Sequence, residues 1–228
     1  MSVHTINIII HVSAGCIAMV LGFVQLARRK GDATHKRFGR VTVTVAATSI
    51  AAAMLGALTF RGKTDLIGVS FLTAYQLWSG MRALHLKYNG RGPLDLLPAL
   101  ALVAGGIAIY LLWRHGGVFN WGPARVYGAM GSLIFYGSYD ILRIVFPQQW
   151  RVVLNPAEHA FKLTSFIGAL VSVATAVLLP GQGVVVSLVA SGVFLILATV
   201  FAVRAARYAL GVRPSAALNA RLKADSEL

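Results

Sequence analysis

The chain has 228 residues, of which 57% are hydrophobic and only 12% are charged. An ordinary soluble domain carries about 25% charged residues, so this composition excludes a soluble protein and predicts an integral membrane protein. The formal net charge of +14 could suit a nucleic-acid partner. The cations are instead spaced as membrane topology requires, and we expect no nucleic-acid partner.

Seven apolar runs follow one another along the chain, each close to the roughly 20 residues that a membrane-spanning helix needs. The runs take up nearly the whole chain, so we expect one domain over residues 1–228, an all-α bundle of seven transmembrane helices. The expected helices are 4–26, 41–60, 66–86, 94–113, 126–146, 157–179 and 184–208, followed by a short basic tail over 209–228.

The lysines and arginines alternate between the two ends of these helices. Of the 21 in the chain, four fall on one side, namely Arg61, Lys63, Arg114 and Arg125, and the others fall on the opposite side. Cytoplasmic loops carry the excess of Lys and Arg, so this pattern predicts an N-terminus outside and a C-terminus in the cytoplasm. We expect a multi-pass protein of the cell inner (plasma) membrane, with anionic lipid headgroups as partners on the cytoplasmic side.

The first run carries a histidine, His11, inside the apolar zone, where a polar side chain is costly. Steps of four and three residues from it reach Gly15, Ala18, Gly22 and Gln25, a single stripe along one helix face. Small residues let membrane helices approach closely. We therefore expect three helix-packing residues between two buried polar anchors, His11 and Gln25. The alternative is that His11 carries protons or ligates a metal ion or haem.

The basic segment after this run contains signals for a helix end and a new start. Gly31 is placed to end the first helix in the left-handed conformation, and Asp32 can cap a new turn. His35, the third residue of that turn, is then expected near the cytoplasmic headgroups on a short ordered segment. A loop histidine among cations is often a solvated interfacial group, and it can also belong to a site.

Polar residues gather at the same end of the later runs. Asp140 lies deepest, about 9 Å before the predicted end of the fifth run, and we expect Arg143 or Arg82 to neutralise it. One interpretation is an ion-pair girdle that fixes helix ends, and the other is a proton relay to water through histidines. The expected cluster consists of Asp140, His159, His35, Arg82, Arg143 and Asp95.

On the outer side, His115 ends the fourth run beside a glycine-rich loop. As a terminal residue it suits an ordinary interfacial position. On the side of His11 it is also the only other histidine that another helix could bring near it, and two helices that present imidazoles can hold a b-type haem. Haem b or a metal ion is therefore a possible cofactor with His11 and His115 as ligands, although the two residues differ in depth.

Several segments resemble a group of uncharacterised bacterial polytopic membrane proteins defined only as a domain of unknown function. They are "IHVSAGCIAMVLGFVQLARRKGDATHKRFGRV", "YQLWSGMRAL", "YDILR" and "EHAFKLTSFIGALVSVATA". Phe161 and Lys162 stand where that group has an Arg-Met pair. The resemblance implies no established activity. It implies that the positions to watch are His11, His35, Asp140 and His159.

Three classes of function follow from these features. A structural or assembly-type membrane subunit, in a homo- or hetero-oligomer, is the first expectation. A proton-coupled transporter or channel would use Asp140, His159 and His35. A haem- or metal-binding redox protein would be a membrane oxidoreductase, which is the enzyme class that the residues leave open.

Overall fold

The computed structural model describes residues 1–60, 65–86, 89–116, 122–179 and 183–211, and all regular structure within these ranges is helical. Most of the predicted basic tail, from residue 212 on, lies outside the described residues. The helices are α1 (Val3–Ala27), α2 (Ala33–Thr59), α3 (Asp65–Leu86), α4 (Pro93–Arg114), α5 (Pro123–Leu142), α6 (Arg151–Leu178) and α7 (Gly183–Gly211), with two 3₁₀ turns, η1 (Arg143–Val145) and η2 (Gln148–Trp150), between α5 and α6.

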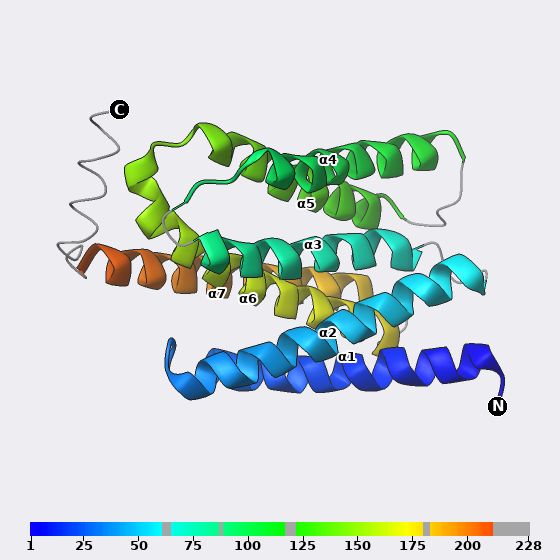
Figure 1. Cartoon of the computed structure of the whole chain (residues 1–228). Helices are drawn as coiled ribbons and strands as arrows, with labels where there is room; N and C mark the ends of the chain where they lie inside the picture. The colour runs from blue at the N-terminus through cyan, green and yellow to red at the C-terminus, as the bar shows by residue number, and fades with distance from the viewer. Residues whose placement is uncertain (61–64, 87–88, 117–121, 180–182, 212–228) are drawn as a thin grey trace.

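The helices run alongside one another with α3 in the centre (Figure 1). Sequence neighbours pack as hairpins, α1 on α2, α4 on α5 and α6 on α7, while α3 packs against α6, α2, α4 and α5. The N-terminus and the C-terminal end of α7 lie at opposite ends of the bundle (Figure 1). The all-α class of the prediction is confirmed.

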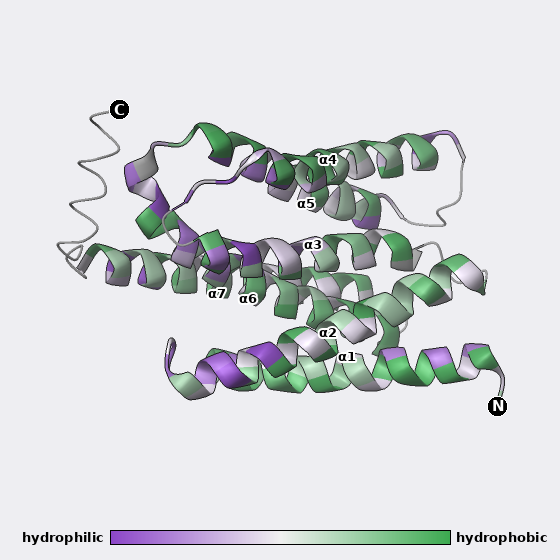
Figure 2. Cartoon of the chain, in the orientation of Figure 1, coloured by the Kyte–Doolittle hydropathy of each residue, from purple (hydrophilic) through white to green (hydrophobic). Residues whose placement is uncertain are grey.

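Five of the helices, α1, α2, α4, α6 and α7, are long and apolar enough to cross a membrane. Their outward faces expose large aliphatic side chains such as Ile17, Leu188 and Ile196, as lipid contact requires. Hydrophilic residues are concentrated at one end of the bundle (Figure 2). These features indicate a membrane protein.

Three predicted helix boundaries are wrong, and each has a local cause. α2 begins at Ala33 and not at 41, because the Asp32 side chain accepts a hydrogen bond from the His35 backbone N–H at 2.5 Å and caps a helix whose first turns are basic. The predicted cap of Asp32 on the turn that contains His35 is confirmed, and this turn continues into α2. Gly31 does adopt the predicted left-handed conformation, with φ of 85°.

α5 ends at Leu142 and not at 146, because the chain turns into η1 before Pro147 and a residue that precedes proline avoids the helical conformation. α6 begins at Arg151 and not at 157, so that Pro156 lies inside the helix. The predicted starts and ends follow apolar runs. The structure extends α2 and α6 into polar sequence and ends α5 earlier than its apolar run.

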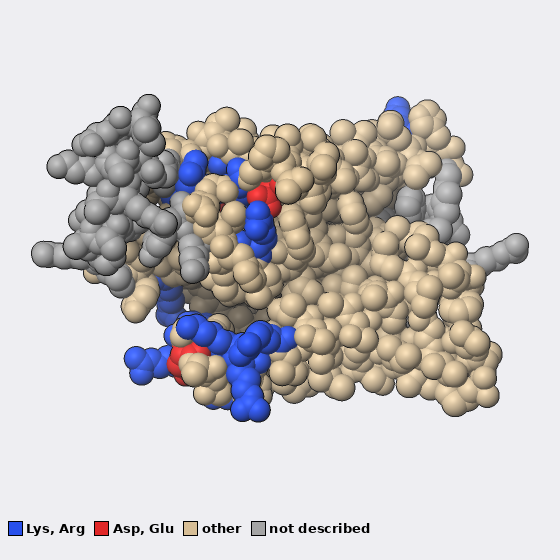
Figure 3. Space-filling model, in the orientation of Figure 1, with Lys and Arg blue, Asp and Glu red and all other residues tan. Residues whose placement is uncertain are grey.

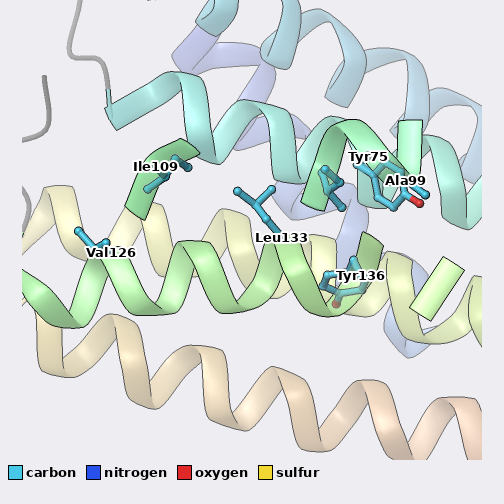
Figure 4. Packing of buried hydrophobic residues seen from close by; sticks show 7 residues of the cluster. Tyr75, Ala99, Ile109, Val126, Leu133 and Tyr136 are labelled. Atoms are coloured by element: carbon cyan, nitrogen blue, oxygen red, sulfur yellow. The ribbon is translucent and has the colours of Figure 1, made fainter. Parts of the chain in front are cut away.

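The core consists of two hydrophobic clusters on either side of α3. Tyr75 of α3 packs with residues of α4 and α5 in the first (Figure 4), and Leu77 of α3 packs with residues of α1, α2, α6 and α7 in the second. Glycines allow close approach within the hairpins. A Cβ at Gly168 of α6 would lie 2.4 Å from the Cβ of Phe194 of α7.

We predict that Gly168→Ala lowers the free energy of unfolding by about 1–3 kcal/mol, because the added methyl group overpacks the α6–α7 contact. The matched control is Gly192→Ala on α7, where an added Cβ meets no atom within 4 Å, and its stability should stay near that of the wild type. Thermal unfolding of both variants in detergent measures the difference. Equal stability of the two variants would contradict the close packing of α6 on α7.

Candidate functional site

Five charged side chains meet inside the bundle at its hydrophilic end. We call them the ionic network, and each of these residues is 6% exposed or less. α5 and α6 supply most of them, and the segment before α4 supplies one. The ionic network consists of Arg91, Asp140, Arg143, Glu158 and Lys162.

Asp140 lies at the centre of the ionic network and its carboxylate accepts hydrogen bonds from several donors. The Lys162 ammonium group donates to both oxygens, at 2.6 and 2.8 Å. The Tyr75 hydroxyl donates at 2.5 Å and the Ser79 hydroxyl at 2.7 Å. The Arg91 guanidinium lies 3.3 Å from the same carboxylate. Such a set of donors stabilises the ionised form of a buried acid.

Glu158, one helical turn before Lys162 on α6, forms the second acidic centre. It accepts hydrogen bonds from Arg143 Nε, from Arg91 Nη2 at 2.9 Å and from the Tyr139 hydroxyl at 3.0 Å. Arg143 also donates to the Asn155 side chain at 2.8 Å. Arg91 therefore contacts both carboxylates and joins the two halves of the ionic network.

The ionic network holds three bases and two acids, so its formal charge is positive by one. Burial by itself would lower the pKa of Arg91, but the carboxylates of Asp140 and Glu158 raise that pKa above its ordinary value. Among the described residues, Arg91 Nε and Nη1 and Arg143 Nη1 have no hydrogen-bond partner. The positions of Arg91 and Arg143 are therefore fixed mainly by their contacts with the two carboxylates.

A second ion pair lies beside the network, between α3 and the start of α4. Arg82 Nε donates to Asp95 at 2.8 Å and Arg82 Nη2 donates at 3.3 Å. Asp95 also accepts from the Gly92 backbone N–H at 2.9 Å, which caps α4. The Arg82 side chain is 40% exposed, so this pair is more solvated than the network.

The expectation that Arg143 or Arg82 neutralises Asp140 is wrong. Arg143 lies in η1, beyond the last α-helical turn, and binds Glu158, while Arg82 reaches Asp95. The partners of Asp140 are Lys162 and Arg91. The sequence contains one signal that Lys162 faces an acidic site, because Lys162 follows Glu158 by four residues on the same helix. Arg91 offered none, because a loop cation before Gly-Pro is ordinary at a membrane surface.

The two histidines of the expected relay lie outside the ionic network. His159 Nδ1 lies 3.0 Å from the Gly80 carbonyl oxygen, on the side of α6 that faces α3. The His35 carbonyl accepts from Gln25, and its buried Nδ1 has no hydrogen-bond partner among the described residues. Within the described ranges, neither histidine forms a hydrogen bond with Asp140.

The stripe of α1 faces other helices. His11 Nδ1 lies 3.0 Å from the Ser49 carbonyl oxygen of α2, and the Ser49 hydroxyl donates to the His11 carbonyl at 2.9 Å. A Cβ at Gly15 would lie 3.1 Å from the Ser49 hydroxyl, and one at Gly22 would lie 2.9 Å from Ile167 of α6. Ala18 is 1% exposed. The stripe thus lies in the contact of α1 with α2 and α6.

His115 is exposed at the C-terminal end of α4. α1 and α4 lie on opposite sides of α3 (Figure 1), and His11 Nδ1 lies beside the Ser49 carbonyl oxygen of α2. No described contact brings His11 and His115 together, and the ligand pair stays a prediction. Over the described residues, no group of three or more His, Cys, Asp or Glu side chains is placed to hold a metal ion.

Comparison of the chain with protein-family models, with curated proteins and with solved structures finds no match. The function of the candidate site is therefore inferred from the geometry of its own residues.

We predict that Lys162→Met destabilises the protein by about 3–5 kcal/mol, because it leaves the Asp140 carboxylate buried without its main partner. The double variant Asp140→Leu/Lys162→Met should recover most of this loss, since an apolar pair replaces an ion pair and the net charge of the network is unchanged. Chemical unfolding in detergent measures both. Arg204→Met, at an exposed position of α7, is the control. A double variant as unstable as the single would contradict the pairing.

Proposed function

We propose that this chain is a structural or assembly-type subunit of the cell inner membrane, with seven transmembrane helices. Its ionic network lies at the cytoplasmic end and fastens the α4–α5 hairpin to α3 and α6. The observation that carries the proposal is the number of donors on Asp140. Lys162, Arg91, Tyr75 and Ser79 all contact this one carboxylate.

Two of the proposed seven helices, α3 and α5, are not among the five that are long and apolar enough to cross a membrane. They have 22 and 20 residues, which at 1.5 Å per residue reach about 30 Å, the thickness of the hydrocarbon core. Their polar side chains, among them Gln76, Ser79 and Asp140, are buried within the bundle. Because these polar residues face inward, they support a membrane-spanning position for both helices.

The charges support the proposed orientation. The network end carries the basic turn between α1 and α2 and the arginines at the end of α7, whereas Arg114 and Arg125 lie at the opposite ends of their helices. The cation-rich end of a membrane protein faces the cytoplasm. The charge distribution therefore supports an N-terminus outside and a C-terminus in the cytoplasm.

A fastening role agrees better with the ion pairs than a proton relay does. α4 and α5 pack mainly on each other and approach the remaining helices through α3. Three ion pairs add links between this hairpin and the other helices: Asp140 with Lys162, Arg143 with Glu158, and Asp95 with Arg82. A relay needs a carboxyl group that gains and loses its proton. Two bases and two hydroxyl donors hold the Asp140 carboxylate ionised.

The variant Asp140→Asn tests the proposed function against proton transport. We expect reduced stability in detergent, and proton flux across liposomes equal to that of the wild-type protein. Asp32→Asn is the matched control, because Asp32 is exposed and forms no salt bridge among the described residues. Asparagine caps a helix about as well as aspartate, so the stability of this variant should stay near that of the wild type.

Proton flux that the wild type supports and Asp140→Asn abolishes, with stability unchanged, would overturn the structural role in favour of a transporter. A haem absorption band in the purified wild-type protein would favour the redox class instead. A partner that co-purifies with the wild type and is lost with Asp140→Asn would support the assembly role.

A further inference from the structure

A groove lies at the cytoplasmic corner of α1 and α2, apart from the ionic network. It has a volume of about 500 Å³. Its surface is mostly carbon, although it opens beside the most basic turn of the molecule. Its lining residues are Leu21 of α1 and Ala33, Thr34, Arg37, Phe38 and Val41 of α2.

The surroundings of this groove carry a large excess of positive charge, which Figure 3 shows as a patch of Lys and Arg over the α1–α2 corner. Residues 28–40 contain six lysines and arginines and one acid, Asp32. That acid caps α2. Among the described residues, four exposed cations here form no salt bridge with a carboxylate: Arg29, Lys36, Arg37 and Arg40.

Two of the six cations already have structural roles, which separates them from the four. The Lys30 ammonium group donates to the Gln25 and Leu26 carbonyls and closes the end of α1. The Arg28 guanidinium lies 5.0 Å from the centre of the Phe38 ring, in a cation–π contact. The free charge is thus concentrated on the first turns of α2.

The groove has a cationic part and an apolar part, and both lie at the basic end of α1 and α2. Arg37 and Val41, one helical turn apart, both line it, so a guanidinium group and an aliphatic wall follow each other along α2. A guanidinium group binds phosphate oxygens in a bidentate manner. A free phosphate ion would use the arginine and leave the apolar wall uncovered, whereas a phospholipid would use both.

We propose that this groove binds one anionic glycerophospholipid of the cytoplasmic leaflet. Arg37 holds its phosphate group, the neighbouring cations attract its headgroup, and an acyl chain lies along Leu21, Phe38 and Val41. The proposal rests on the membrane orientation of the proposed function, and it is independent of the role of the ionic network.

The test uses the full chain in a zwitterionic detergent, with phosphatidylglycerol, phosphatidylcholine or inorganic phosphate added. Phosphatidylglycerol should raise the midpoint of thermal unfolding, because a ligand that binds the folded state stabilises it. Native mass spectrometry should retain one phosphatidylglycerol molecule per chain. Phosphatidylcholine and inorganic phosphate should do neither.

Two variants locate the site. Arg37→Gln should weaken the retention of phosphatidylglycerol about fivefold, the loss expected for one cation near an anionic headgroup. Leu21→Trp should weaken it by filling the apolar part of the groove. The control Arg204→Gln removes an exposed arginine from α7 at the same end and should leave retention unchanged.

Arg37 is exposed, so its variant keeps the fold and its result alone decides the charge requirement. Equal retention of phosphatidylglycerol and phosphatidylcholine, or equal weakening by Arg37→Gln and Arg204→Gln, would overturn the proposal. A shift with inorganic phosphate as large as that with phosphatidylglycerol would replace the lipid with a free anion. None of these outcomes depends on Asp140, so a failure here is distinct from a failure of the fastening role.

Discussion

The ion pair between Asp140 and Lys162 is the interaction on which the arrangement of this bundle depends. In an apolar environment a carboxylate and an ammonium group pair with each other, because a buried charge without a partner strongly destabilises the fold. Lys162 lies on α6 and Asp140 on α5, so their contact at 2.6 Å fixes the end of one hairpin against another. Ser79 of α3 contacts both side chains. Three helices are thereby positioned at a single point.

Polar and apolar side chains of α3 stabilise different parts of the interior. Tyr75 belongs to the hydrophobic cluster with α4 and α5, and its hydroxyl also donates to Asp140. Leu77, on another face, packs into the cluster with α1, α2, α6 and α7. Dispersion and close packing hold the middle of the bundle. The ionic network gives its end of the bundle a single geometry, which packing among small and aliphatic side chains does not specify as well.

The sequence predicts the helices well and the pairing of charges poorly. The apolar runs predict each helix. Gly31 and Asp32 predict the turn between α1 and α2, because helix capping depends on residues that are adjacent in the sequence. The runs miss the first turns of α2, since those turns are basic, and the predicted start of this helix therefore lies too far along the chain. Partner choice depends on three-dimensional approach. Arg143 follows Asp140 by three residues, yet it binds Glu158 because the α-helix ends between them. Arg91 lies 49 positions away from Asp140 in the chain, and no sequence pattern near Arg91 predicts its contact with this carboxylate.

The protonation state of Asp140 tests the account most directly. Infrared difference spectroscopy of the wild type and of Asp140→Asn, titrated between about pH 5 and pH 9, detects any protonated carboxyl group at this position. A fixed ion pair between α5 and α6 predicts a carboxylate band from Asp140 that persists across the range and no carboxylic acid band that the variant lacks. A carboxylic acid band that rises and falls with pH, and that is absent from Asp140→Asn, would contradict a fastening role and would favour a proton relay.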